Sequence, residues 1–234
     1  MRLTLSGIAL IAAVAAAPAV AVQPVTFLST GIYNPGHVDA TVNGTTVNEF
    51  ATPLHFEESS VKKGVFDALG FCVDLPHPIY VGVGYQLKST LNFHVAPLTS
   101  DGYGKALTSL QVREITGLAH LGFTIAKGSA ADKPAQLAAI QQAIWTVEYP
   151  SSTFAATGSF AAAQTSYTAD FLKAAPKLSG FARFLTSDSG NVQAQATDVG
   201  GVPEPLVWVE MMAGFALVGT VSRNRRGLTT IVAA

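Results

Sequence analysis

The pattern of apolar and polar positions divides the middle of the chain into a strand-rich first part and a helix-rich second part. Between Val25 and Leu98 the spacing favours strands. Val38–Val42 alternates with period two, Asn43-Gly44 favours a hairpin turn, and Thr45–Phe50 supplies the return strand. The polar stretch Glu57–Lys63 predicts a loop. Further strand candidates are Val65–Leu75, Ile79–Leu87 and Leu91–Val95.

Helical periodicity begins in the second part of the chain. Thr108 and Gln111 form the sequence signature of a capping box, which opens a first helix that we expect to end at Gly122. A second helix is predicted after Asp132, which we take as its N-cap, with Pro134 in the first turn. Tyr149-Pro150 ends it. Its apolar positions at helical spacing are Leu137, Ile140, Ile144 and Val147.

The remaining elements complete an α+β pattern. A third helix is predicted over Ala163–Ala175, and Phe181–Leu185 and Val192–Ala196 flank a turn-forming stretch, 188–191, as in a hairpin. Strands, then helices, then a hairpin favour α+β over alternating β-α-β units. We therefore predict an antiparallel sheet or barrel-like layer with a small helical subdomain.

The two ends are typical of processing segments. Met1–Ala21 combines the positive Arg2, an apolar stretch and small residues before a cleavage point, as in a signal peptide removed by signal peptidase. The mostly apolar run Leu206–Val221 spans 16 residues. As a helix it would measure about 24 Å, short of a ~30 Å hydrocarbon core, so we expect only transient inner-membrane insertion. These two runs contribute much of the mean hydropathy of +0.35.

The segment 202–226, VPEPLVWVEMMAGFALVGTVSRNRR, resembles the PEP-CTERM sorting signal of Gram-negative bacteria in its PEPxxW form. The resemblance implies an exported protein of the cell envelope or surface. It also implies recognition by an exosortase-type transpeptidase and cleavage near the Pro-Glu-Pro. Val209 stands where alanine is usual, and a short tail follows the arginines. The residues that carry the resemblance most strongly are Pro203, Glu204, Pro205, Trp208, Arg223, Arg225 and Arg226.

These segments predict a signal peptide at 1–21, an exported α+β domain at 22–199, and a linker with the sorting signal at 200–234. The net charge of −1 excludes a nucleic-acid partner bound through bulk phosphate attraction. The single cysteine excludes an intramolecular disulfide and any multi-cysteine metal site. We expect no cofactor and no metal ion.

The lone Cys72 admits several interpretations. The simplest is a small buried hydrophobic side chain. The others are a catalytic thiolate, a metal ligand, an intermolecular disulfide and an internal crosslink. A cysteine hydrolase needs an imidazole base, for which His77, His94 and His120 are available, although none lies in a protease-like signature. A metal site would combine Cys72 with Asp74 and His77, at a spacing that matches no recognised ligand pattern.

Gln141 is predicted to face the core. At about 100° per residue it falls on the apolar stripe of the second helix, beside Leu137 and Ile144. A buried primary amide without partners costs about 1–3 kcal/mol. The residues alone leave two interpretations: a structural glutamine bonded to the backbone of a neighbouring strand, or one half of a reactive pair.

Phe71-Cys72-Val73-Asp74 and the segment 140–145, IQQAIW, resemble the two signatures of bacterial thioester domains, which are surface adhesin modules with a TQxA[IV]W motif. The resemblance covers a domain core at about 65–150. It implies an internal thioester between Cys72 and Gln141, formed with loss of ammonia. Ile140 replaces the motif threonine. The expected surroundings of the bond are Phe71, Asp74, Trp145 and Tyr149.

The combined resemblances favour an adhesion or matrix-attachment module over an enzyme. Its partner would be a surface amine or a matrix polymer, which attacks the thioester once, so that attachment takes place without turnover. Two alternatives stay open: a non-reactive structural or exopolysaccharide- and biofilm-associated surface protein, and, with less support, a secreted cysteine hydrolase.

Overall fold

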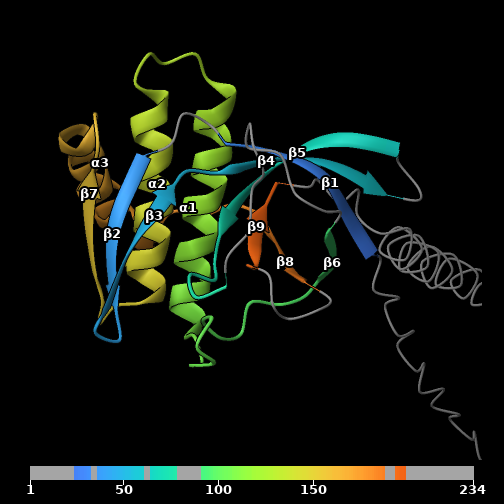
Figure 1. The fold of residues 1–234 in the computed structure, drawn as a ribbon, viewed down its shortest axis with the longest axis horizontal. Coiled ribbons are helices and arrows are strands. Elements are labelled where there is room, and N and C mark those ends of the chain that lie inside the picture. The colour runs from blue at the N-terminus through green and yellow to red at the C-terminus, as the bar shows by residue number, and fades with distance from the viewer. Residues whose placement is uncertain (1–23, 33–35, 61–63, 78–90, 188–192, 199–234) are drawn as a thin grey trace, which may run out of the picture.

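The structure is a computed structural model that describes residues 24–32, 36–60, 64–77, 91–187 and 193–198 (Figure 1). The predicted signal peptide, the strand predicted over residues 79–87 and the sorting segment lie outside the described residues. Within them the fold is α+β, with two antiparallel sheets and three helices.

The larger sheet closes into a barrel in the order β1-β4-β5-β9-β8-β6. Each neighbouring pair is antiparallel, and the ring closes because β1 pairs with both β4 and β6. Closure gives each barrel strand a partner on both sides over at least part of its length. The barrel strands are β1 (Pro24–Ile32), β4 (Leu54–Ser60), β5 (Gly64–Cys72), β6 (Leu91–Val95), β8 (Arg183–Ser187) and β9 (Gln195–Thr197).

The smaller sheet has the order β3-β2-β7. Strands β2 (Gly36–Val42) and β3 (Thr45–Ala51) form the predicted hairpin. Asn43 and Gly44 form its turn with φ angles of 51° and 79°, the positive values that a two-residue type I′ turn requires. The third strand, β7 (Thr153–Thr157), comes much later in the chain and pairs with β2.

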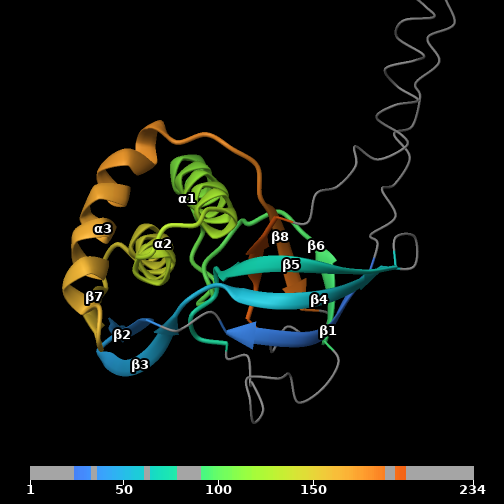
Figure 2. The same cartoon turned by 90° about the horizontal axis from the view of Figure 1, so that it is seen from above.

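Three helices complete the fold: α1 (Ser109–Lys127), α2 (Lys133–Glu148) and α3 (Ala161–Ala174), the last continued by a 3₁₀ turn over Ala175–Lys177. Helix α2 is the central element, packed against α1, α3, β5 and all three strands of the smaller sheet. Figure 2 shows it end-on, enclosed between α1, α3 and the β2–β3 hairpin, with the barrel to one side.

Helix α2 therefore links two apolar clusters. One joins Ile140 and Ile144 of α2 to Phe71 of the barrel and to α1. The other joins Trp145 and Tyr149 to Cys72 and to β2. Phe71 and Cys72 enter different clusters because consecutive residues of a strand point to opposite faces.

Several predictions of single elements are confirmed. Thr108 and Gln111 form the capping box, with reciprocal side-chain bonds to each other's backbone. The third helix lies within two residues of its predicted bounds. Strands β8 and β9 pair antiparallel, as expected for the predicted hairpin, although its turn lies outside the described residues.

Two predictions need correction, and a third holds for position alone. Strand β4 continues to Ser60 through the stretch expected to be a loop, because its backbone pairs with β1 on one side and β5 on the other. Helix α1 does not end at Gly122 but runs to Lys127. Asp132 is the N-cap residue of α2, with Pro134 in the first turn, as predicted. Its side chain forms no capping hydrogen bond, and the carboxylate instead accepts hydrogen bonds from Gln136 and Tyr167.

Gly122 serves close packing rather than helix termination. A Cβ at this position would overlap the Phe71 ring. We therefore expect Gly122→Ala to destabilise the fold by about 1–3 kcal/mol through overpacking, although alanine is the better helix former. Urea denaturation measures this, with Thr124→Ala at an exposed position of the same helix as the control. A Gly122→Ala protein as stable as the wild type would contradict the packing account.

Candidate functional site

Cys72 lies where the pairing between β5 and β4 has ended. The last residue pair of that ladder is Leu54 with Gly70. On the opposite edge of β5, the backbone N–H of Val73 donates to the Ala194 carbonyl at 3.0 Å. Because backbone groups alternate between the two edges of a strand, the N–H and C=O of Cys72 face the edge that β4 has left.

The side-chain amide of Gln141 takes the place of the missing strand. Its Oε1 accepts a hydrogen bond from the Cys72 N–H at 2.9 Å, and its Nε2 donates to the Cys72 carbonyl, also at 2.9 Å. Gln141 is fully buried. The prediction that this glutamine faces the core is therefore confirmed, and the amide lies directly against the cysteine.

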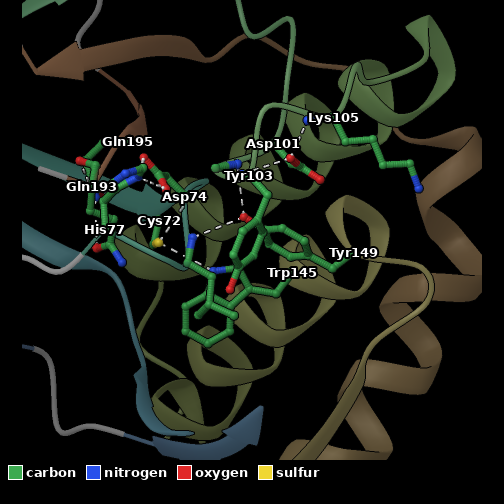
Figure 3. A network of polar contacts seen from close by, with 12 residues as sticks. Cys72, Asp74, His77, Asp101, Tyr103, Lys105, Trp145, Tyr149, Gln193 and Gln195 are labelled. Atoms are coloured by element: carbon green, nitrogen blue, oxygen red, sulfur yellow. Dashed lines mark hydrogen bonds and ion pairs between the residues drawn. The ribbon is translucent and has the colours of Figure 1, made fainter. Parts of the chain in front are cut away.

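The Cys72 sulfur has two donors of its own. Trp145 Nε1–H donates to Sγ at 3.4 Å and the Asp74 backbone N–H at 3.5 Å (Figure 3). Burial nevertheless raises the pKa of the thiol well above its ordinary value, and the charge of Glu148 raises it further. The two N–H donors act in the opposite direction. The resting sulfur is therefore a thiol that needs a proton acceptor before it can attack.

The expected surroundings of the bond are only partly brought together. Trp145, Tyr149 and Asp74 lie around Cys72 (Figure 3). Phe71 does not: its ring packs on Phe123 in the other cluster, with ring centroids 5.6 Å apart.

The Tyr149 hydroxyl group connects two loops beside Cys72. Its hydroxyl oxygen accepts hydrogen bonds from the Leu75 N–H at 3.2 Å and from the Gly102 N–H at 3.3 Å. Tyr103, beside Gly102, packs edge-on against the Tyr149 ring. Asp101 stabilises the same loop by accepting from the N–H groups of Tyr103 and Lys105. One hydroxyl thus holds the segment that follows Cys72 to a loop that precedes α1.

Tyr149→Phe removes that hydroxyl and keeps the ring. The buried N–H of Leu75 and the part-buried N–H of Gly102 then lose their acceptor. One unpaired buried donor costs about 1–3 kcal/mol, and a part-buried donor adds little because water can replace its partner. We expect a loss of unfolding free energy in that range together with faster amide hydrogen exchange at both residues. Tyr103→Phe is the control, since the described contact of Tyr103 with Tyr149 is between the rings. Unchanged exchange at Leu75 and Gly102 would contradict this role.

Two buried carboxylic acids in this part of the fold were not predicted from the sequence. Asp101 is buried, and Glu148 is 1% exposed at the last position of α2. Burial raises the pKa of Glu148 well above its usual range, and the charges of Asp74 and Asp101 act in the same direction. A signal for Glu148 was available, because it lies seven residues, two helical turns, after Gln141.

The three candidate histidines do not form a Cys-His pair in the described part of the chain. His77 Nδ1 contacts the Asp74 carboxylate at 2.7 Å. His120 is exposed on α1, and His94 lies on β6 between β1 and β8. Neither hydrogen bond of the Cys72 sulfur involves a histidine. Among the described residues, no group of three His, Cys, Asp or Glu side chains is arranged to hold a metal ion.

In comparisons with known proteins, no family model, no curated protein and no solved structure matches this chain. None of the helices within the described residues is long and apolar enough to cross a membrane.

Proposed function

We propose that this protein is an exported attachment module in which Cys72 and Gln141 form an internal thioester. The observation that carries the proposal is the pair of 2.9 Å hydrogen bonds that hold the Gln141 amide against the Cys72 backbone. A buried cysteine and a buried glutamine from distant parts of the chain, 69 positions apart, thereby become fixed neighbours. The resemblance to thioester-domain signatures supports the same pair.

The bond would form by acyl transfer within the folded chain. Cys72 Sγ attacks Gln141 Cδ, the Cδ–Nε2 bond breaks, and ammonia leaves with the thiol proton. The Cys72 N–H already donates to Oε1, so it is placed to stabilise the negative charge that develops on this oxygen during attack. Amides are poor electrophiles, and fixed contact in a site that excludes water supplies much of the required activation.

The thioester would then serve a single covalent attachment. An amine of a surface protein or matrix polymer attacks Cδ, forms a stable amide with residue 141 and releases the Cys72 thiol. The protein is consumed in this step, so it is an attachment device rather than an enzyme.

Isoleucine at position 140 does not weaken the proposal. The side chain of Ile140 is fully buried in the apolar cluster with Phe71 and α1. Both polar atoms of the Gln141 amide are positioned by the Cys72 backbone instead. The orientation of the amide therefore needs no hydroxyl group from the preceding residue.

A specific observation favours a second candidate, a structural or exopolysaccharide-associated surface protein without a reactive bond. The Gln141 amide replaces a strand partner for Cys72, a role that a purely structural glutamine also fulfils. Both candidates are consistent with the hydrogen bonds between Gln141 and the Cys72 backbone. They differ in whether a covalent bond joins the two side chains.

Amine labelling separates these candidates. The purified exported protein is incubated with methylamine, and the peptide containing residue 141 is sequenced by mass spectrometry. The thioester proposal predicts a γ-methylamide on Gln141 together with a newly alkylatable Cys72. An unlabelled Gln141 and a Cys72 thiol that is alkylated without methylamine treatment would favour the structural candidate.

Export and sorting form the second part of the proposal, and they rest on the sequence of the two ends. Signal peptidase and an exosortase-type transpeptidase are the proposed partners, and a Gram-negative cell envelope or surface is the proposed location. Deleting residues 203–234 should change surface display. Display at the wild-type level would contradict the sorting signal.

A further inference from the structure

Glu148 is buried without a hydrogen bond that would account for its burial. Its side chain is 1% exposed, and neither carboxylate oxygen has a hydrogen-bond partner of normal geometry among the described residues. Buried polar atoms in native proteins are nearly always paired, so an unpaired carboxyl group calls for an explanation. Glutamine at this position would have nearly the same shape and would never carry a charge.

The helix places Glu148 on the face that carries the proposed reaction. Gln141, Trp145 and Glu148 follow one another at intervals of four and three residues, which aligns them along one stripe of α2. Side chains of a helix lean toward its N-terminus, so Glu148 leans back over the turn that contains Trp145. Trp145 in turn donates its indole N–H to the Cys72 sulfur.

The surroundings of Glu148 disfavour its charged form from several sides. Asp74, which is paired with His77, and the buried Asp101 both repel a carboxylate at position 148. The position is also the last residue of α2, where the helix dipole opposes negative charge. Tyr149 is the remaining titratable neighbour, and its hydroxyl acts in favour of the carboxylate. Glu148 and Cys72 repel each other when both are deprotonated, so the loss of a proton from one group makes the loss of a proton from the other less favourable.

We propose that Glu148 is the acid–base group of the Cys72–Gln141 centre, an inference that rests on the proposed thioester. The carboxylate accepts the thiol proton as Sγ attacks Cδ. The resulting carboxylic acid returns this proton to Nε2 as the C–N bond breaks and ammonia leaves. Glu148 ends the cycle unchanged, so the balance is one thiol and one amide converted into one thioester and one ammonia. Attack by an amine uses the same group, which passes the amine proton to the departing sulfur.

Glu148→Gln tests the role without changing the shape of the site. Protein produced in unfolded form, with the Gln141 amide still intact by mass, is refolded without amines, and thioester formation is followed by the loss of ammonia in intact-mass spectra. General acid–base catalysis contributes about 10²–10⁴-fold, so we expect formation to slow by at least about 100-fold. The wild-type rate should rise with pH as Glu148 ionises, and the Glu148→Gln rate should lose this dependence. Asp101→Asn is the matched comparison, because asparagine can still accept the two N–H bonds in its loop. It should keep the fast formation of the thioester and move the rise of the rate to lower pH, because a charge that repels the Glu148 carboxylate is gone.

A second readout does not depend on the thioester. Methylamine treatment leaves Cys72 as a free thiol whether or not the bond had formed, and its alkylation by iodoacetamide is then measured against pH. We expect Glu148→Gln to move the midpoint of alkylation to lower pH, because the repelling charge is gone. An unchanged midpoint overturns the inference even if no thioester exists. Wild-type and Glu148→Gln proteins that form the thioester equally fast overturn it and leave the proposed function intact. A wild-type protein that never loses ammonia overturns the proposed function.

Discussion

Cys72→Ser is expected to abolish covalent amine incorporation at Gln141 completely while leaving the fold in place. Serine keeps an oxygen that can accept from Trp145 Nε1–H and from the Asp74 N–H, the two donors to the native sulfur. A hydroxyl group is far less nucleophilic than a thiolate and is a poor leaving group toward amines. The chemistry is therefore lost while the packing of the site is retained. Incorporation of a fluorescent primary amine, followed by peptide mapping, measures the effect.

The interpretation of that result depends on the stability of the variant. Urea denaturation of Cys72→Ser should give a free energy of unfolding within about 1 kcal/mol of the wild-type value after amine treatment has opened any thioester. Amine incorporation at Gln141 that continues in the serine variant would show that another group activates the amide, and the Cys72–Gln141 assignment would then be wrong.

Gln141→Leu is expected to have the second large effect, on stability as well as on chemistry. Leucine fills a similar volume but leaves the Cys72 N–H and C=O buried without partners. At about 1–3 kcal/mol for each orphaned group, the loss should reach about 2–6 kcal/mol. It arises in the edge of β5 that β4 does not cover, so amide exchange at Cys72 should accelerate with it. Thermal or urea denaturation together with hydrogen exchange measures both consequences.

Gln136→Leu is the matched control on the same helix. Gln136 is only partly buried, and its described hydrogen bond goes to the exposed carboxylate of Asp132. Its replacement should change stability by no more than about 0.5 kcal/mol. If both glutamine variants lost similar stability, the pairing of Gln141 with the Cys72 backbone would not explain the result.

The meeting of Cys72 and Gln141 could be predicted because two independent local signals pointed to it. Helical phase placed Gln141 on the apolar stripe, and the motif resemblance paired it with Cys72. Local sequence did not reveal why the amide is needed there. This depends on β4 beginning at Leu54, opposite Gly70, so that it does not extend alongside Cys72, and strand partners are set by residues far apart in the chain.

The sequence pattern also did not predict that α2 is buried on more than one face. Gln142 lies about 100° from Gln141 around the helix, yet it is buried as well and bonds to Phe154 of β7 and to Gln164 of α3. Both partners follow α2 in the chain, and β7 was not predicted at all. Glu148 escaped notice for a related reason, since a carboxylate at the end of a helix is ordinarily solvated and only tertiary packing buries it.

In strand β4 the polar composition led to a wrong prediction, a loop where the structure has a strand. Its residues Glu57, Glu58, Ser59 and Ser60 lack the apolar alternation of a half-buried strand. The ladders to β1 and β5 nevertheless satisfy its backbone on both sides. Closure of the barrel thus outweighs the weak local preference of polar residues for loops.

The central claim, a covalent bond between Cys72 and Gln141, is tested most directly by the intact mass of the folded, exported protein, kept free of amines. The account predicts a mass lower by one ammonia than that of the Cys72→Ser protein after correction for the substituted atom. Addition of methylamine should raise this mass by one methylamine, which leaves the protein one CH₂ group heavier than the full mass. A folded protein of full mass, whose Cys72 is alkylated as a free thiol, would contradict the account.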